Sequence, residues 1–193
     1  MIDKETEIQL VSRAQQGEVE AFMVLAREYE KQIFGLIYRL TKDREDAADL
    51  TQETLLRAFS GIKNFRLRSS FHTWIHKIAV NLTLNHLRKN LGYKERGEGF
   101  DEDKKEEQLE GHFPSPEEVS MNEELTVRLE KAIDELPLIY KTAFTLVIFQ
   151  GLTHAQAAAI LGCSESTISW KIHEARKMLK EKLKPYFGLM KEV

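Results

Sequence analysis

The chain has 193 residues, of which 31% are charged and 42% hydrophobic, with a formal net charge of −3. This composition is ordinary for a water-soluble globular protein, and the length suits one domain or two small ones. The sequence contains no apolar run of about 18 residues, which excludes a membrane-spanning helix. Its single cysteine, Cys163, excludes an internal disulfide. We therefore expect a cytoplasmic protein with no membrane insertion.

The net charge hides a segregation of charge along the chain. Residues 1–92 carry a net charge of +2 and residues 125–193 one of +3, whereas residues 93–124 carry −8. The stretch 93–113 is rich in charged residues and glycine and nearly free of aliphatic side chains, a composition typical of unfolded segments. We therefore predict two folded modules, residues 1–92 and 114–193, joined by a flexible acidic linker over residues 93–113.

Helical periodicity dominates the sequence, and strand alternation is almost absent. In the first module, apolar spacings of three and four predict a helix over residues 5–16, which Gly17 ends, and a long helix over residues 18–40. Asp43 is suited to cap a third helix, which runs to about Ile62 and has an acidic first turn. We expect an all-α fold.

A central helix is predicted from Ser70, a suitable N-cap, to about Gly92, after a loop over residues 61–69. Between Thr54 and Lys94 the sequence has no acidic residue. One side of this helix is apolar, and a second side combines an aromatic ring with cations and carboxamides. Such groups stack on bases, pair with phosphates and hydrogen-bond base edges. The second side comprises Trp74, Lys77, Asn81, Asn85 and Arg88.

Two interpretations of this surface stay open at this point. A solvated helix face also carries Lys, Arg and Asn, and Trp74 lies at the edge of the apolar side, where it would belong to the core. The absence of acids favours nucleic acid, because an ordinary solvated face mixes both signs of charge. A further apolar stripe belongs either to the core or to a protein contact; it is formed by Val80, Leu84, Leu87 and Leu91.

The second module begins with a helix over residues 117–136. Ser115 as N-cap and Pro116 in the first turn are suited to start it, and Pro137 ends it. A mostly apolar helix is predicted next, over residues 138–149.

Two short helices joined by a glycine-containing turn follow, which predicts a helix-turn-helix. Thr153 and Gln156 form a capping box at the first helix, Gly162 suits its C-terminal end, and Ser164 caps the second helix. The N-terminal residues of such a second helix reach base edges in the major groove. Trp170 lies opposite the apolar stripe of this helix, which indicates either a DNA contact or an exposed aromatic used in a contact between proteins.

Three sequence blocks, in this order, resemble the extracytoplasmic-function (ECF, group IV) sigma factors of bacterial RNA polymerase, members of the sigma-70 family. They are DREDAADLTQETLLRAF, FHTWIHKIAVNL and LPLIYKTAFTLVIFQGLTHAQAAAILGCSESTISWKIHEARKML. The resemblance covers nearly the whole chain. It implies a region 2 bundle that binds core polymerase and the −10 element, and a region 4 helix-turn-helix that binds the −35 element. It also implies control by an anti-sigma factor.

The resemblance assigns roles to particular residues. The implied core polymerase contact consists of Asp46, Asp49, Gln52, Glu53 and Arg57. The implied −10 contact consists of Asn64, Phe65, Arg66, Arg68, Ser69, Ser70, Phe71, Trp74, Lys77, Asn81, Asn85 and Arg88. The implied −35 contact consists of Ser164, Ser166, Thr167, Ser169, Trp170, Lys171, His173, Arg176 and Lys177.

Three classes of function compete. The favoured one is a promoter-specificity subunit that acts with core RNA polymerase on promoter DNA. A free-standing operator-binding regulator would need a two-fold dimer to read paired half-sites, and the sequence has neither coiled-coil heptads nor a separate dimer helix. An enzyme would need a catalytic set, a phosphate-binding glycine loop or metal-ligand spacing, and none of these patterns is present. We therefore expect no enzymatic activity, no cofactor, no metal and no small-molecule substrate.

Overall fold

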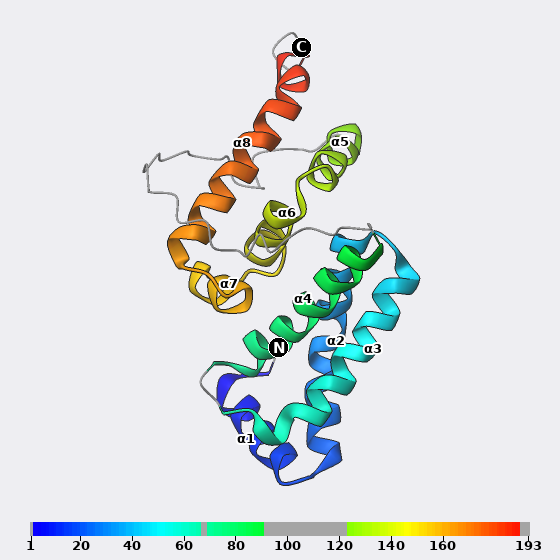
Figure 1. Ribbon diagram of the computed structural model, residues 1–193, viewed down its shortest axis with the longest axis vertical. Helices are drawn as coiled ribbons and strands as arrows, with labels where there is room; N and C mark the ends of the chain where they lie inside the picture. Colours follow the sequence, from blue (N-terminus) through cyan, green and yellow to red (C-terminus); the bar gives the residue numbers. More distant parts are fainter. Residues whose placement is uncertain (1, 67–68, 91–122, 190–193) are drawn as a thin grey trace.

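The computed structural model describes residues 2–66, 69–90 and 123–189. Within these residues every regular element is a helix, and the helices form two modules, which confirms the predicted fold class (Figure 1). The linker predicted for residues 93–113 lies outside the described residues, as do Leu91 and the predicted helix start at Ser115 and Pro116.

The first module is a helical bundle built around the long second helix. Helix α2 packs against α1 and α3, and α4 packs against both α2 and α3. The fully buried side chains of the first module include Leu25, Ile33 and Leu36 on α2 and Ile75 on α4, and those of α2 recur at helical spacing. The elements are α1 (Lys4–Gln15), α2 (Val19–Thr41), α3 (Arg44–Gly61), the 3-10 turn η1 (Ile62–Asn64) and α4 (Phe71–Asn90).

Local capping fixes the helix boundaries, as the sequence predicts. The Asp43 carboxylate accepts hydrogen bonds from the backbone N–H groups of Glu45 and Asp46, at 2.8 and 2.9 Å, at the start of α3. The Ser70 hydroxyl accepts from the backbone N–H of Thr73 at 3.1 Å at the start of α4. Gly17 has φ +97° in the turn between α1 and α2, a conformation that favours glycine.

The second module has α8 as its long helix, with α5, α6 and α7 packed against it. One predicted element differs from the structure. The helix expected over residues 138–149 is α-helical only to Phe144 and continues as a π-helix, in which the backbone N–H of Gln150 donates to the Thr145 carbonyl at 3.1 Å. The elements are α5 (Glu123–Asp134), α6 (Leu138–Phe144), the π-helical η3 (Thr145–Phe149), α7 (His154–Leu161) and α8 (Glu165–Leu189).

The predicted helix-turn-helix is present in α7 and α8. Thr153 and Gln156 form the expected capping box at the start of α7. Gly162 ends α7 with φ +71°, and the Ser164 hydroxyl accepts from the backbone N–H of Thr167 at 3.1 Å at the start of α8. The two helices are joined further by a 2.9 Å hydrogen bond between His154 Nδ1 and the Ser169 hydroxyl.

The two modules pack against each other. Helix α4 of the first module lies against α7 of the second, and α2 contacts α6 and η3 (Figure 1). Val80 and Leu84, from the further apolar stripe of the central helix, are 0% and 5% exposed. They share a face of α4 with His76, whose ring lies beside the side chain of Gln150 from the second module. The part of this stripe formed by Val80 and Leu84 therefore belongs to the buried face of α4 that meets the second module, whereas Leu87 is half-buried.

Candidate nucleic-acid interface

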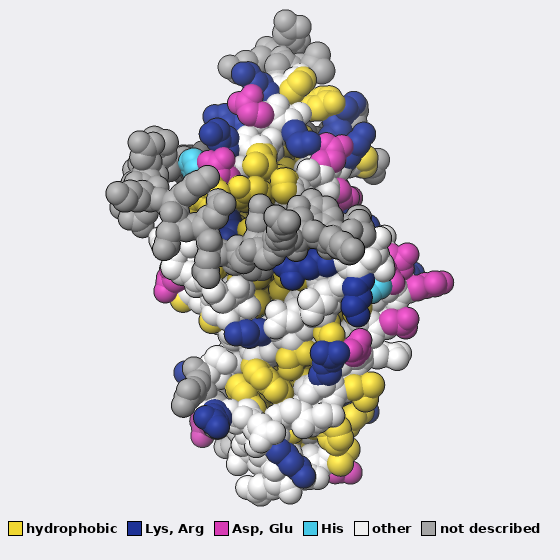
Figure 2. All heavy atoms as spheres, viewed as in Figure 1, with side chains coloured by type: hydrophobic (Ala, Val, Ile, Leu, Met, Phe, Trp, Pro, Cys, Tyr) yellow, Lys and Arg dark blue, Asp and Glu magenta, His cyan; other side chains and the backbone are white. Residues whose placement is uncertain are grey.

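The polar side of α4 is a continuous exposed surface along one face of the helix. Lys77, Asn81, Asn85 and Arg88 are all exposed, as the helical spacing predicts. On the face of the molecule shown in Figure 2, acidic side chains gather at the edge near α3, whereas Lys and Arg side chains lie along α4. The surface can therefore attract phosphates and offer carboxamides to bases.

Trp74 is shared between this surface and the core. Its ring is half-buried and stacks on the ring of Phe65, with centroids 4.8 Å apart and planes inclined by 29°. It also contacts Phe71 at 5.6 Å, and it packs so closely on Gly61 that a Cβ atom there would lie 3.3 Å from the indole. The protein therefore covers one face of the Trp74 ring, which leaves less of the indole for stacking on a base.

The loop before α4 divides into buried anchors and exposed polar residues. Phe65 and Phe71 are 7% and 1% exposed, so they hold the loop to the core and do not present a ring to DNA in this arrangement. Their rings pack on each other and on Trp74, and the DNA contact predicted for them stays a prediction. Of the remaining expected residues, Asn64, Arg66 and Ser69 are exposed, Ser70 is half-buried as the cap of α4, and Arg68 lies outside the described residues.

Helix α1 contributes two polar residues that the sequence interpretation missed. The Gln15 side chain donates to the backbone carbonyls of Ile62 and Phe65, at 3.1 and 2.6 Å. The buried Glu7 carboxylate accepts from the backbone N–H of Phe71 at 3.2 Å and from the Tyr29 hydroxyl. A signal was present in the sequence, because Glu7 shares the buried face of α1 with Leu10, Val11 and Ala14, where an acid is unexpected.

Two histidines lie at the N-terminal half of α4, between this loop and the second module. Burial lowers the pKa of His76 to about 4, and the neighbouring His72 adds to this, so His76 is neutral at physiological pH. Its Nδ1 lies 2.8 Å from the His72 carbonyl, to which a neutral ring donates. Burial also lowers the pKa of His72, an effect that the Glu7 carboxylate opposes.

The predicted −35 surface lies at the N-terminal half of α8. Of the residues expected there, Ser164, Ser166, Ser169, His173 and Lys177 are exposed, and Arg176 is half-buried. Ser166, His173 and Lys177 lie on the side of α8 opposite its apolar stripe, as a major-groove helix requires.

Three residues of this predicted surface are less accessible than expected. Thr167 and Lys171 are 8% and 2% exposed, and the Thr167 hydroxyl lies 2.7 Å from the hydroxyl of the N-cap Ser164. Trp170 is half-buried against Tyr140 of α6, with ring centroids 5.8 Å apart. The indole therefore also packs α8 against α6, and the DNA or protein contact predicted for Trp170 stays a prediction.

The predicted polymerase-binding residues lie on the outer face of α3. Asp49, Gln52, Glu53 and Arg57 are exposed, and Arg57 pairs with Glu53 at 2.6 Å one turn away. The remaining residue of this set, Asp46, is half-buried and hydrogen-bonded to His86 Nε2 at 2.8 Å.

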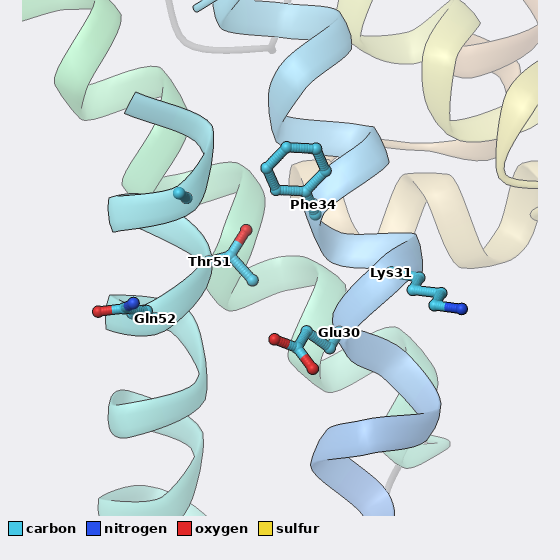
Figure 3. Close-up of a pocket in the computed structure, with 6 residues that line it drawn as sticks. Glu30, Lys31, Phe34, Thr51 and Gln52 are labelled. Atoms are coloured by element: carbon cyan, nitrogen blue, oxygen red, sulfur yellow. The ribbon is translucent and has the colours of Figure 1, made fainter. Parts of the chain in front are cut away.

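A groove of about 410 Å³ runs between α2 and α3 beside these residues (Figure 3). Its walls carry charged, amide and aromatic side chains, so it offers both polar and apolar contacts next to Gln52. The lining residues are Glu30, Lys31, Phe34, Ala48, Thr51 and Gln52.

Polar contacts add to the packing between the modules. Asp134 Oδ1 of the second module lies 2.8 Å from Lys42 Nζ of the first and 3.2 Å from Lys141 Nζ of its own. Burial lowers the pKa of Lys141, and Asp134 opposes that effect. The Arg39 guanidinium lies 3.8 Å from the centre of the Phe149 ring, a cation–π contact from α2 to the π-helix.

The model of the sigma-70 region 2 family matches residues 25–91, and that of sigma-70 region 4 matches residues 126–179. The RNA polymerase sigma-H factor of Pseudomonas aeruginosa is 33% identical, over 96% of this chain and 97% of its own. The ECF RNA polymerase sigma-E factor of Haemophilus influenzae is 32% identical, over 96% of this chain and 99% of its own. This chain belongs to the ECF sigma factors of the sigma-70 family. The sequence-based family resemblance is confirmed.

Solved structures agree with the fold of this sigma factor. The structure of CnrH in complex with the cytosolic domain of CnrY superimposes with a TM-score of 0.69 over 93% of this chain and 98% of that one, at 19% identity. The sigma factor RpoE of Bartonella quintana, in complex with the anti-sigma factor NepR, gives a TM-score of 0.63 over 84% and 96%, at 25% identity.

No described helix is both long and apolar enough to cross a membrane. No group of three or more His, Cys, Asp or Glu side chains among the described residues could hold a metal ion.

Proposed function

We propose that this sigma factor reads two promoter elements with two surfaces, one on each module. The polar side of α4 and the exposed residues of the preceding loop contact the −10 element. The N-terminal half of α8 contacts the −35 element. The observation that carries this assignment is the exposed row of Lys77, Asn81, Asn85 and Arg88 within the match to region 2. The module boundaries proposed from charge, residues 1–92, 93–113 and 114–193, contain the two family matches without dividing either.

The exposed face of α3 is the proposed docking surface for core polymerase. Its acids and amide are accessible, and they are separated from the basic surface of α4, so both surfaces can be occupied together. The chain contributes binding and positioning and no catalytic step of its own. It acts in the cytoplasm, where its polymerase and promoter partners are found.

An anti-sigma factor is the third proposed partner. The Bartonella RpoE that shares this fold and 25% of its sequence is bound to one. A protein that covered the α3 face or the α4 surface would keep this sigma factor from polymerase and DNA.

Binding both promoter elements requires the modules to separate. Helices in contact have axes about 10 Å apart, and the eight residues of α7 span about 12 Å, so α8 begins within about 30 Å of α4. Promoter elements about 17 base pairs apart are separated by about 58 Å. The packed arrangement is therefore a resting form, and polymerase holds the modules apart.

The isolated protein is expected to bind duplex promoter DNA weakly and not to open it. Opening costs about 1.4 kcal/mol of stacking for each base-pair step, and one aromatic stack returns about 1–3 kcal/mol. The stacking energy expected of a half-buried Trp74 lies at the low end of that range, so several captured bases and the polymerase are needed to open the DNA.

Permanganate footprinting, which detects unpaired thymines, tests whether opening of the DNA requires the polymerase. We expect reactive thymines near the −10 element only when core polymerase and the chain are both present, and fewer of them with the double variant Lys77→Ala, Asn81→Ala. Reactive thymines with the chain alone would contradict the proposal. A symmetric footprint of the chain alone on paired half-sites would favour the operator-binding regulator.

A further inference from the structure

Helix α1 holds both ends of the loop that precedes α4, although it lies outside the region 2 match. That match begins at residue 25, and α1 ends at Gln15. The Gln15 side chain donates to the carbonyls of Ile62 and Phe65 at the start of the loop. Two turns earlier on the same helix, Glu7 accepts from the backbone N–H of Phe71 at the end of the loop.

Hydrogen bonds to both carboxylate oxygens compensate for the burial of Glu7. The side chain is buried, and a carboxylate removed from water is costly unless it is hydrogen-bonded. One oxygen accepts from the Tyr29 hydroxyl, which burial and Glu7 hold in its protonated form by raising its pKa. The other oxygen accepts from the first backbone N–H of α4, where the helix dipole favours a negative charge. Glu7 therefore ties α1 and α2 to the start of α4.

The Gln15 contact fixes the other end of the loop. Its amide has two N–H donors, and the two loop carbonyls lie within reach of that one nitrogen. The Phe65 backbone N–H donates to the Ile62 carbonyl and closes the turn in which Asn64 is exposed, and Gln15 stabilises this closed turn. Phe65 in turn stacks on Trp74, which connects this turn to the polar side of α4.

We propose that Glu7 and Gln15 are positioning residues for −10 recognition. They fix the two ends of the loop, so that Asn64, Arg66 and Ser69 meet the same bases in each complex. The inference rests on the proposed function, because it presumes that this loop contacts the −10 element. Loosening the loop lowers the discrimination between −10 sequences more than it lowers total binding, since phosphate contacts by Lys77 and Arg88 do not depend on the loop.

The test uses the full chain with bacterial core polymerase and a promoter library randomised at both the −10 and the −35 element. The initiating sequences are counted for wild type, Gln15→Ala, Glu7→Ala and Glu7→Gln. Gln16→Ala is the matched control, because Gln16 is exposed next to Gln15 at the end of α1. The −35 preferences, which come from α8, serve as a control within each experiment.

Gln15→Ala and Glu7→Ala are expected to weaken the −10 base preferences by about threefold to tenfold while leaving the −35 preferences unchanged. Glu7→Gln should retain most of the preference, because its carbonyl oxygen still accepts from the Phe71 N–H. If Glu7→Ala does not fold, Gln15→Ala decides the question. Gln15→Ala with wild-type −10 preferences would overturn the proposal, and so would an equal loss at both elements. If wild type gives no discrete starts, the proposed function itself fails, and the positioning role falls with it.

Discussion

The ring of Trp74 stacks on the ring of Phe65, so the aromatic residue of the −10 surface is held by a residue of the preceding loop. Phe65 is buried and also meets Phe71 edge to face at 6.2 Å. The three rings form one cluster at the junction of loop and helix. The cluster fixes where the indole lies, and it also makes the site part of the folding core.

Removing the buried ring of this cluster should destabilise the protein. Phe65→Ala is expected to lower the free energy of unfolding by about 3 kcal/mol, because the substitution leaves a cavity between Phe71 and Trp74. Urea denaturation followed by tryptophan fluorescence measures the change. Lys63→Ala, at an exposed position nearby, should change it by less than about 0.5 kcal/mol. A loss below about 1 kcal/mol for Phe65→Ala would show that the cluster does not hold the loop.

The buried His76 predicts a dependence of stability on pH. Its pKa is about 4 in the folded chain and returns towards 6.5 on unfolding, so the unfolded chain binds a proton that the folded chain does not. The free energy of unfolding is therefore unaffected by His76 above pH 6.5, and it falls by at most about 3 kcal/mol as the pH decreases towards 4. The titratable groups facing His76 are His72 and, through it, Glu7.

Chemical denaturation at several pH values measures this effect. His76→Gln should flatten the decline between pH 6.5 and 5 relative to wild type, whereas His173→Gln, at an exposed position, should leave it unchanged. Parallel curves for wild type and His76→Gln would show that another group is responsible.

Asp134 should matter more to stability than its exposed partner Lys42. Replacing Asp134 with Asn leaves the buried Lys141 ammonium without its counter-charge, so we expect a loss of about 1–2 kcal/mol. Lys42→Ala removes only a solvent-accessible pair between the modules and should cost less than about 1 kcal/mol. Thermal and urea unfolding of both variants gives the comparison, and equal losses would contradict it.

Separation of the modules can be followed by the distance between two spin labels. Glu20 on α2 and Lys180 on α8 are exposed, and each can be changed to Cys in a Cys163→Ser background. We expect this distance to increase by at least about 20 Å when core polymerase is added, because the promoter elements lie about 58 Å apart. A label pair at Glu20 and Lys63, within the first module, should not change. An unchanged distance between the modules would contradict the opening step.

Local signals in the sequence were sufficient for those helix ends that a side-chain cap or a glycine fixes. The caps at Asp43, Ser70 and Thr153 and the left-handed Gly162 depend on a few neighbouring residues, so the sequence alone predicts them. The exposed row on α4 follows from helical spacing in the same way.

Features that depend on distant contacts were not predictable. The burial of Val80 and Leu84 depends on the packing of α4 against other helices, and no feature of the local sequence marks the change to a π-helix at Thr145. The helical pattern placed Trp170 opposite the apolar stripe, but it carried no information about Tyr140 of α6, which contacts the ring. The burial of Glu7 was visible only as an acid at an apolar position.

Run-off transcription with core polymerase, on a library of promoter fragments, decides whether the two modules read two promoter elements. We expect discrete transcript starts only when the chain is present, with two enriched sequence elements about 17 base pairs apart, since the two modules read them separately. An absence of stimulated starts, together with binding of duplex DNA by the chain alone, would contradict this expectation.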